Sequence, residues 1–126
     1  PDSNTTKLQR ESSNTPLQAL TTLNNDVYTE AAQAMASRVL RHPAANDSER
    51  VTYALRLCIA REAQPAEVDR FVTLLQLARE YYEGHADDAT KLTARHAAER
   101  IAPAENAAWV ATTRVIINLD EFIVRD

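Results

Sequence analysis

Glycine is nearly absent from this chain. One glycine, Gly84, occurs in 126 residues, where average usage would give roughly nine. Tight turns between strands rely on glycine, whereas a glycine inside a helix costs about 1 kcal/mol relative to alanine. The shortage therefore argues against a sheet-rich fold, excludes the glycine-rich loops that bind phosphates, and predicts an all-α protein.

Cysteine is equally scarce, with Cys58 as the single example. One cysteine excludes an internal disulfide, a CxxCH haem-attachment site and a zinc site built on paired cysteines. Because Cys58 stands between Leu57 and Ile59, we expect a small buried side chain rather than a nucleophile. The sequence predicts no cofactor.

Positive charge is limited and scattered. The net charge is -4, and only Lys7 and Lys91 are lysines. Without a basic cluster we expect neither a nucleic-acid partner nor a membrane-surface role. A helix-turn-helix around residues 61–64 is the remaining DNA-binding alternative, but acidic residues share its surface. No apolar run approaches the roughly 18 residues of a membrane span.

The chain begins with Pro1, and its single methionine is Met35. We therefore expect a piece of a longer parent protein. Residues 1–13 carry one aliphatic side chain, Leu8, and show no periodicity, which predicts a flexible lead-in. Residues 14–126 are expected to form a single helical domain.

Helix signals occur along the rest of the chain. Thr15 and Gln18 form a capping box around Pro16. Apolar spacing predicts further helices over about 27–41, 48–60, 65–83, 88–100 and from Pro103 onward, with Asn46 or Asp47 as a cap. Gly84 is expected to close its helix in left-handed geometry. Short connections favour an antiparallel bundle of five to six helices.

Each expected helix has one apolar side that we expect to be buried. The terminal NLDEFIVRD segment is expected to continue the last helix or to turn back on it. The predicted buried residues are Val27, Ala31, Ala34, Met35 and Val39, then Val51, Ala54, Leu55 and Cys58, then Val68, Phe71, Leu75, Ala78 and Tyr82, then Ala89 and Leu92, and finally Trp109, Thr113, Ile116 and Ile117.

No strong metal pattern occurs. His85 and His96 are eleven residues apart, and Asp87 or Asp88 is better explained as a helix cap. Residues 24–26 lack the glycine and glutamate of a calcium loop. We therefore expect capping and solvent exposure here rather than a metal site.

Two groups of residues are candidates for interaction. Asp120 and Glu121 are adjacent carboxylates that Arg114 or Asn118 would accompany in a site completed by other sequence. A salt bridge or a cap explains this pair more simply. Tyr81 is the exposed aromatic candidate for stacking on a sugar, because helical spacing assigns Tyr82 and Trp109 to the core.

Three stretches together resemble a known family. They are residues 14–26 (NTPLQAL followed by LNND), residues 54–67 and residues 107–122, which end in NLDEF. In order and over about residues 14–125, they resemble the C-terminal part of a planctomycete-type domain of unknown function found in large secreted proteins. Asn25 stands where that family more often has aspartate.

The resemblance implies a secreted or cell-envelope parent in polysaccharide-rich surroundings, in which the domain follows a cytochrome-c-like module. It transfers no catalytic residue. Our leading hypothesis is a non-catalytic helical module that packs against the remainder of its parent chain. The alternatives are a contribution to a composite, polysaccharide-related enzyme site, or a module that binds carbohydrate or another envelope protein.

Overall fold

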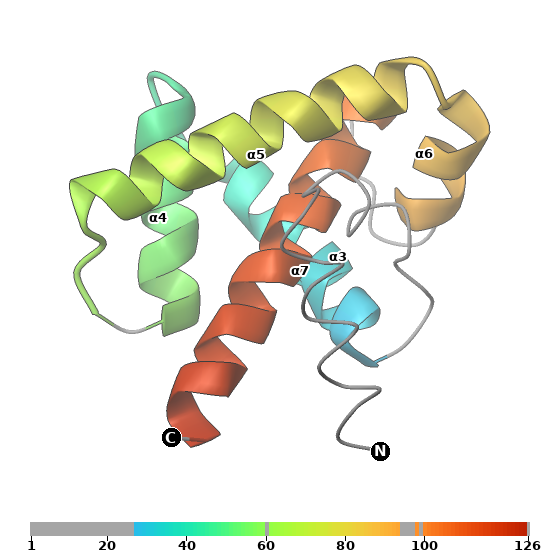
Figure 1. The fold of residues 1–126 in the computed structure, drawn as a ribbon. Coiled ribbons are helices and arrows are strands. Elements are labelled where there is room, and N and C mark those ends of the chain that lie inside the picture. The colour runs from blue at the N-terminus through green and yellow to red at the C-terminus, as the bar shows by residue number, and fades with distance from the viewer. Residues whose placement is uncertain (1–26, 60, 94–97, 99, 126) are drawn as a thin grey trace.

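The computed structural model of the chain describes residues 27–59, 61–93, 98 and 100–125, except for the side chains at 27, 28 and 120–125. The expected lead-in and the helix expected to begin at Pro16 lie outside this part. The described residues form the helices α3 (Val27–Arg41), α4 (Asp47–Ile59), α5 (Pro65–Glu83), α6 (Ala86–Thr93) and α7 (Pro103–Arg125). The expected all-α bundle is confirmed (Figure 1).

Helix α7 is the centre of the bundle. It packs against all four other described helices, and α5 crosses its N-terminal half obliquely (Figure 1). Every residue from 106 to 113 is buried. A helix that is buried all round lies inside a protein rather than on its surface. The expected core positions Trp109, Thr113 and Ile116 are confirmed, and the NLDEF segment continues the helix.

Helix α5 follows its sequence pattern closely. All five residues of its apolar stripe are buried, from Val68 to Tyr82. The helix begins at Pro65, where the Glu67 carboxylate accepts a hydrogen bond from the Gln64 backbone N–H at 3.1 Å. This contact satisfies a donor that the first helical turn would leave unpaired.

Helix α3 buries a different side from the one expected. Ala31 and Ala34 are exposed. Val39 is buried as expected, but the other described buried residues of the helix are Thr29, Ala32, Gln33, Ala36 and Ser37. Gln33 Nε2 donates to the Leu92 carbonyl oxygen at 2.6 Å. The burial of this polar side chain is therefore stabilised by a hydrogen bond rather than by apolar packing.

The junction between α3 and α4 is fixed by polar contacts. Arg50 Nη1 donates to the carbonyl oxygens of Val39 and His42 at 2.6 and 2.7 Å, which places a cation at the negative end of α3. Asn46 Oδ1 accepts from the Glu49 backbone N–H at 2.9 Å. Asn46 is therefore the N-cap of α4, as the sequence predicts.

Two expectations about the segment after α5 are wrong. Gly84 has φ −93° and ψ 0°, so it lies in the right-handed region. The N–H groups of Gly84 and His85 bond back three residues, which tightens the last turn without a left-handed residue. In addition, the helix expected over about 88–100 corresponds to α6 (Ala86–Thr93), and the described residues 98 and 100 are not helical. Among the described residues other than glycine, Arg100 has positive φ, at 67°.

Candidate functional site

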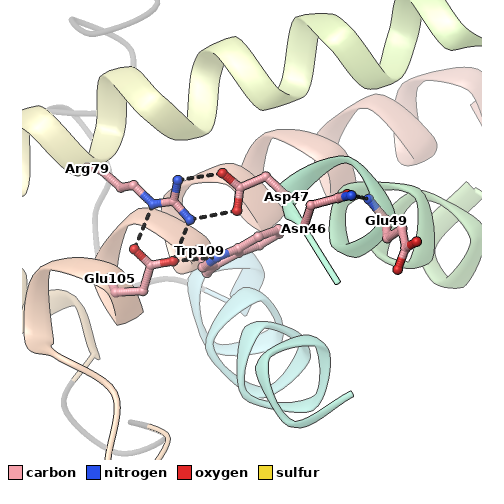
Figure 2. Close-up of polar contacts among 6 residues, drawn as sticks. All are labelled: Asn46, Asp47, Glu49, Arg79, Glu105 and Trp109. Carbon is pink, nitrogen blue, oxygen red and sulfur yellow. Dashed lines mark hydrogen bonds and ion pairs between the residues drawn. The ribbon is translucent and has the colours of Figure 1, made fainter. Parts of the chain in front are cut away.

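Arg79 joins three helices through one guanidinium group (Figure 2). Its Nη1 and Nη2 donate to the two carboxylate oxygens of Asp47 at 2.6 and 2.9 Å. Its Nε and Nη2 donate to the two oxygens of Glu105 at 2.6 and 2.7 Å. Paired, charge-assisted bonds of this kind are among the strongest polar contacts in proteins, and they fix orientation as well as distance.

The positions of the two acids follow from local helix rules. Asp47 is the first residue of α4, and Glu105 lies in the first turn of α7. Carboxylates are stabilised at these positive helix ends. Trp109, one turn beyond Glu105, donates its Nε1–H to Glu105 Oε2 at 3.1 Å, so its single polar atom is satisfied although the residue is fully buried. We call Arg79, Asp47, Glu105 and Trp109 the Arg79 cluster.

The electrostatics of the Arg79 cluster favour full ionisation. Hydrogen bonding to Arg79 is the main cause that lowers the pKa of Asp47 below its ordinary value. The same bonds to Asp47, followed by those to Glu105, raise the pKa of Arg79. Because Asp47 stays ionised at neutral pH with both oxygens engaged, it is unsuited to act as a general acid. The cluster links helices rather than forming a reaction centre.

A second ion pair closes the connection between α4 and α5. Arg61 donates from Nη1 and Nη2 to the oxygens of Glu67 at 3.1 and 2.7 Å. Glu67 is buried, and its pKa is lowered first by Arg61 and then by the Gln64 backbone N–H. Arg61, which the helix-turn-helix alternative would direct toward phosphates, is thus engaged within the chain.

Buried Asn106 organises the turn that precedes α7. Its Oδ1 accepts from the Ala98 N–H at 2.9 Å, and its Nδ2 donates to the Ile101 carbonyl at 3.0 Å. These bonds hold residues 98 and 101 in a non-helical path, which includes the left-handed Arg100. They account for the non-helical backbone of residue 98, where the sequence predicts a helix.

The predicted site residues on α7 are only partly described. Arg114 is half-buried, and Asn118 is exposed one turn later. The backbones of Asp120 and Glu121 continue the helix, but their side chains lie outside the described residues. The composite site that would combine these four residues stays a prediction.

Tyr81 is more enclosed than its sequence position indicates. Its ring stacks on His85 with centroids 3.9 Å apart and contacts Tyr82 edge-on at 4.9 Å. Its hydroxyl donates to Asp88 Oδ2 at 3.0 Å. Most of the stacking and hydrogen-bonding capacity of Tyr81 is therefore used at the junction between α5 and α6.

An open hollow of about 390 Å³ lies beside Tyr81, lined by residues 84–88. Three of the four residues considered above for a metal site, His85, Asp87 and Asp88, line it, whereas the fourth, His96, lies outside the described residues. Within the part of the chain that the structure describes, no three His, Cys, Asp or Glu residues are arranged to hold a metal ion.

The contact between Arg79 and Glu105 is not predicted by the sequence. The position of Glu105, two residues after a helix-starting proline, is a recognisable cap signal. Arg79 lies next to the apolar stripe of α5, and nothing in its local sequence indicates a partner 32 residues earlier. Contacts over such separations leave no periodic signal.

The fold and its ion pairs define a compact all-α bundle centred on α7. Comparison with known families shows the family to which the chain belongs. A family model described as PSD1, protein of unknown function (DUF1553), matches residues 1–75, and the chain belongs to this family. The match contains the resemblance stretches at 14–26 and 54–67, whereas the stretch at 107–122 lies beyond it.

The comparison confirms the expected assignment to a family of unknown function. No curated protein and no solved structure showed significant similarity to the chain. None of the described helices has the combination of length and hydropathy that crossing a membrane requires.

Proposed function

We propose that the chain is a non-catalytic helical module of a larger secreted or cell-envelope protein, and that it packs against the remainder of that protein. The observation that carries the proposal is the use of its polar side chains. The side chains of Arg79, Asp47 and Glu105 bond to one another and so join α4, α5 and α7. Such bonds stiffen a module and preorganise its surface for association.

The C-terminal part of α7 is the surface that we assign to this contact. Figure 1 shows this part of the helix continuing well beyond the crossing with α5. Val115 and Leu119 are four residues apart, lie on one face of the helix, and are half-buried, each packing in part against the core of this chain. Partly exposed apolar side chains on a stiff helix favour burial against a neighbouring polypeptide.

The direct test is association between this chain and the separately produced remainder of its parent protein, measured by co-elution and calorimetry. We expect a complex with a dissociation constant below about 10 μM. Leu119→Glu should weaken it at least tenfold, because it would bury a charge in the contact. Gln76→Glu, an exposed change on α5, is the matched control and should leave binding unchanged.

Three results would contradict the proposal. The first is a remainder that never associates with the chain, and the second is equal weakening by both substitutions. The third is an enzymatic activity of the intact protein that is lost in Asp120→Ala or Glu121→Ala while the protein stays folded. That result would favour the composite catalytic site instead.

Export of the parent protein is tested separately, by locating it in envelope and culture-medium fractions.

A further inference from the structure

One face of α4 carries a polar stripe beside a second hollow. Glu49, Thr52, Tyr53 and Arg56 follow one another at intervals of three, one and three residues, so they share one side of the helix. Together with His42 and Ser48, they line an open hollow of about 330 Å³. Small-molecule sites in proteins begin at about this volume.

The hollow contains a fixed aromatic pair. The rings of His42 and Tyr53 stack with centroids 3.6 Å apart and planes 4° from parallel. His42 follows the end of α3, and its carbonyl oxygen accepts a 2.7 Å bond from Arg50. The ring pair is thus held in place before any ligand arrives, which lowers the entropic cost of binding.

The polar groups of the hollow are still available. Within the described part of the chain, the Arg56 guanidinium and the Tyr53 hydroxyl have no hydrogen-bonding partner, and Arg56 is exposed. Glu49 uses one carboxylate oxygen to accept from the Ala45 N–H at 2.9 Å. Its second oxygen, the Ser48 hydroxyl and the Arg56 donors therefore offer both acceptors and donors to one ligand.

We propose that this hollow binds a neutral sugar residue of an oligosaccharide. Sugar hydroxyls donate and accept, which matches a lining that contains a carboxylate, hydroxyls and a guanidinium. The apolar face of a sugar ring packs on aromatic side chains, and the His42–Tyr53 pair supplies one. Glu49 disfavours an anion here, and Arg56 disfavours a cation. The proposed carbohydrate contact therefore lies on α4, whereas the sequence predicts it at Tyr81.

The test is a titration of the ¹⁵N-labelled chain, followed by amide chemical shifts, with neutral tetrasaccharides of glucose, mannose, xylose and N-acetylglucosamine. We expect at least one to shift the amides of Tyr53 and Arg56 saturably, with a dissociation constant between about 0.1 and 5 mM. Arg56→Gln should weaken this binding at least about fivefold, because it removes charge-assisted donors. Arg70→Gln, which changes an exposed arginine outside the hollow, should leave it unchanged.

Other outcomes would overturn the proposal. They are an absence of saturable shifts up to about 20 mM sugar, equal weakening by both arginine variants, or shifts confined to the Tyr81 junction. Inorganic phosphate that shifts the α4 amides where the tetrasaccharides do not would identify an anion site instead. This experiment is independent of the proposed packing role, because it uses no other part of the parent protein.

Discussion

Arg79 and Glu105 lie 26 residues apart in the sequence, yet the Nε and Nη2 atoms of the arginine each contact one carboxylate oxygen of the glutamate, at 2.6 and 2.7 Å. The same guanidinium also holds Asp47. One side chain of α5 therefore ties the N-termini of α4 and α7 together. The three side chains are 26–32% exposed, so water screens the cluster only partly.

Loss of this arginine should destabilise the fold. In Arg79→Met, two carboxylates would lose their shared partner, and we expect the free energy of unfolding to fall by about 1–2 kcal/mol. Urea unfolding followed by the fluorescence of Trp109, the single tryptophan, measures the change. Arg70→Met on the same helix is the control and should stay within about 0.5 kcal/mol of the parent chain. Equal effects of the two substitutions would show that the cluster contributes nothing specific.

Acidic pH should lower the folding stability of the protein through protonation of Asp47 and Glu67. Their pKa values are lowered below 3.8 and 4.5 by Arg79 and Arg61, respectively. Because a depressed folded-state pKa means that the unfolded state binds protons first, the stabilisation is present above about pH 5. It is lost as the pH falls through the folded-state values. Urea midpoints measured from about pH 6 to pH 3 should fall, and the fall should be shallower in Asp47→Asn and Glu67→Gln.

Alkaline pH should destabilise the folded protein through ionisation of the Tyr82 hydroxyl. Burial is the main cause that raises the pKa of its hydroxyl to about 12, and the neighbouring Tyr81 and Asp88 add to it. The folded state therefore favours the protonated phenol. This stabilisation is present below about pH 10 and is lost as the pH rises toward 12. Tyr82→Phe should lose less stability between about pH 9 and pH 11.5, and an unchanged alkaline profile in that variant would contradict the assignment.

Gly84→Ala should stabilise the chain, contrary to what the sequence indicates. With φ −93° the backbone suits alanine, and an added Cβ would meet the Tyr81 carbonyl oxygen at an ordinary 3.7 Å. The substitution lowers the conformational entropy of the unfolded chain, so we expect a gain of about 0.4–1 kcal/mol. The thermal midpoint measures it. Arg100→Val is the opposite control, because a β-branched residue is strained at φ 67°, and it should lower the midpoint.

The sequence predicts those parts of the fold in which apolar spacing decides packing. Helix α5 is the clearest case, since its full apolar stripe is buried. The bounds of helix α3 are predicted correctly, as is the burial of Val39. Most of its buried side is not, because that side includes Thr29, Gln33 and Ser37, whose polar side chains are typical of a protein surface. Residue 98, which the sequence places in a helix, is instead non-helical and donates its N–H to Asn106, eight residues later. The partners of Arg79 likewise come from tertiary structure, which local pattern does not encode.

Thr112 and Thr113 provide the last prediction. Both are fully buried on α7, and their hydroxyls have no hydrogen-bonding partner among the described residues. Thr93, also buried on a helix, donates instead to the Ala89 carbonyl at 3.1 Å. A buried hydroxyl without a partner carries a desolvation penalty of about 1–3 kcal/mol, which valine of similar shape removes.

Thr112→Val and Thr113→Val should therefore each raise the free energy of unfolding, by about 1 kcal/mol, whereas Thr93→Val should lower it by a similar amount. The three variants share the same change in volume and in helix propensity, so the difference in sign isolates the hydrogen bond. Chemical denaturation at neutral pH measures all three. If Thr113→Val destabilises the chain as much as Thr93→Val does, its hydroxyl is satisfied in solution, and a buried water bridging it to the polar side of α3 becomes the explanation.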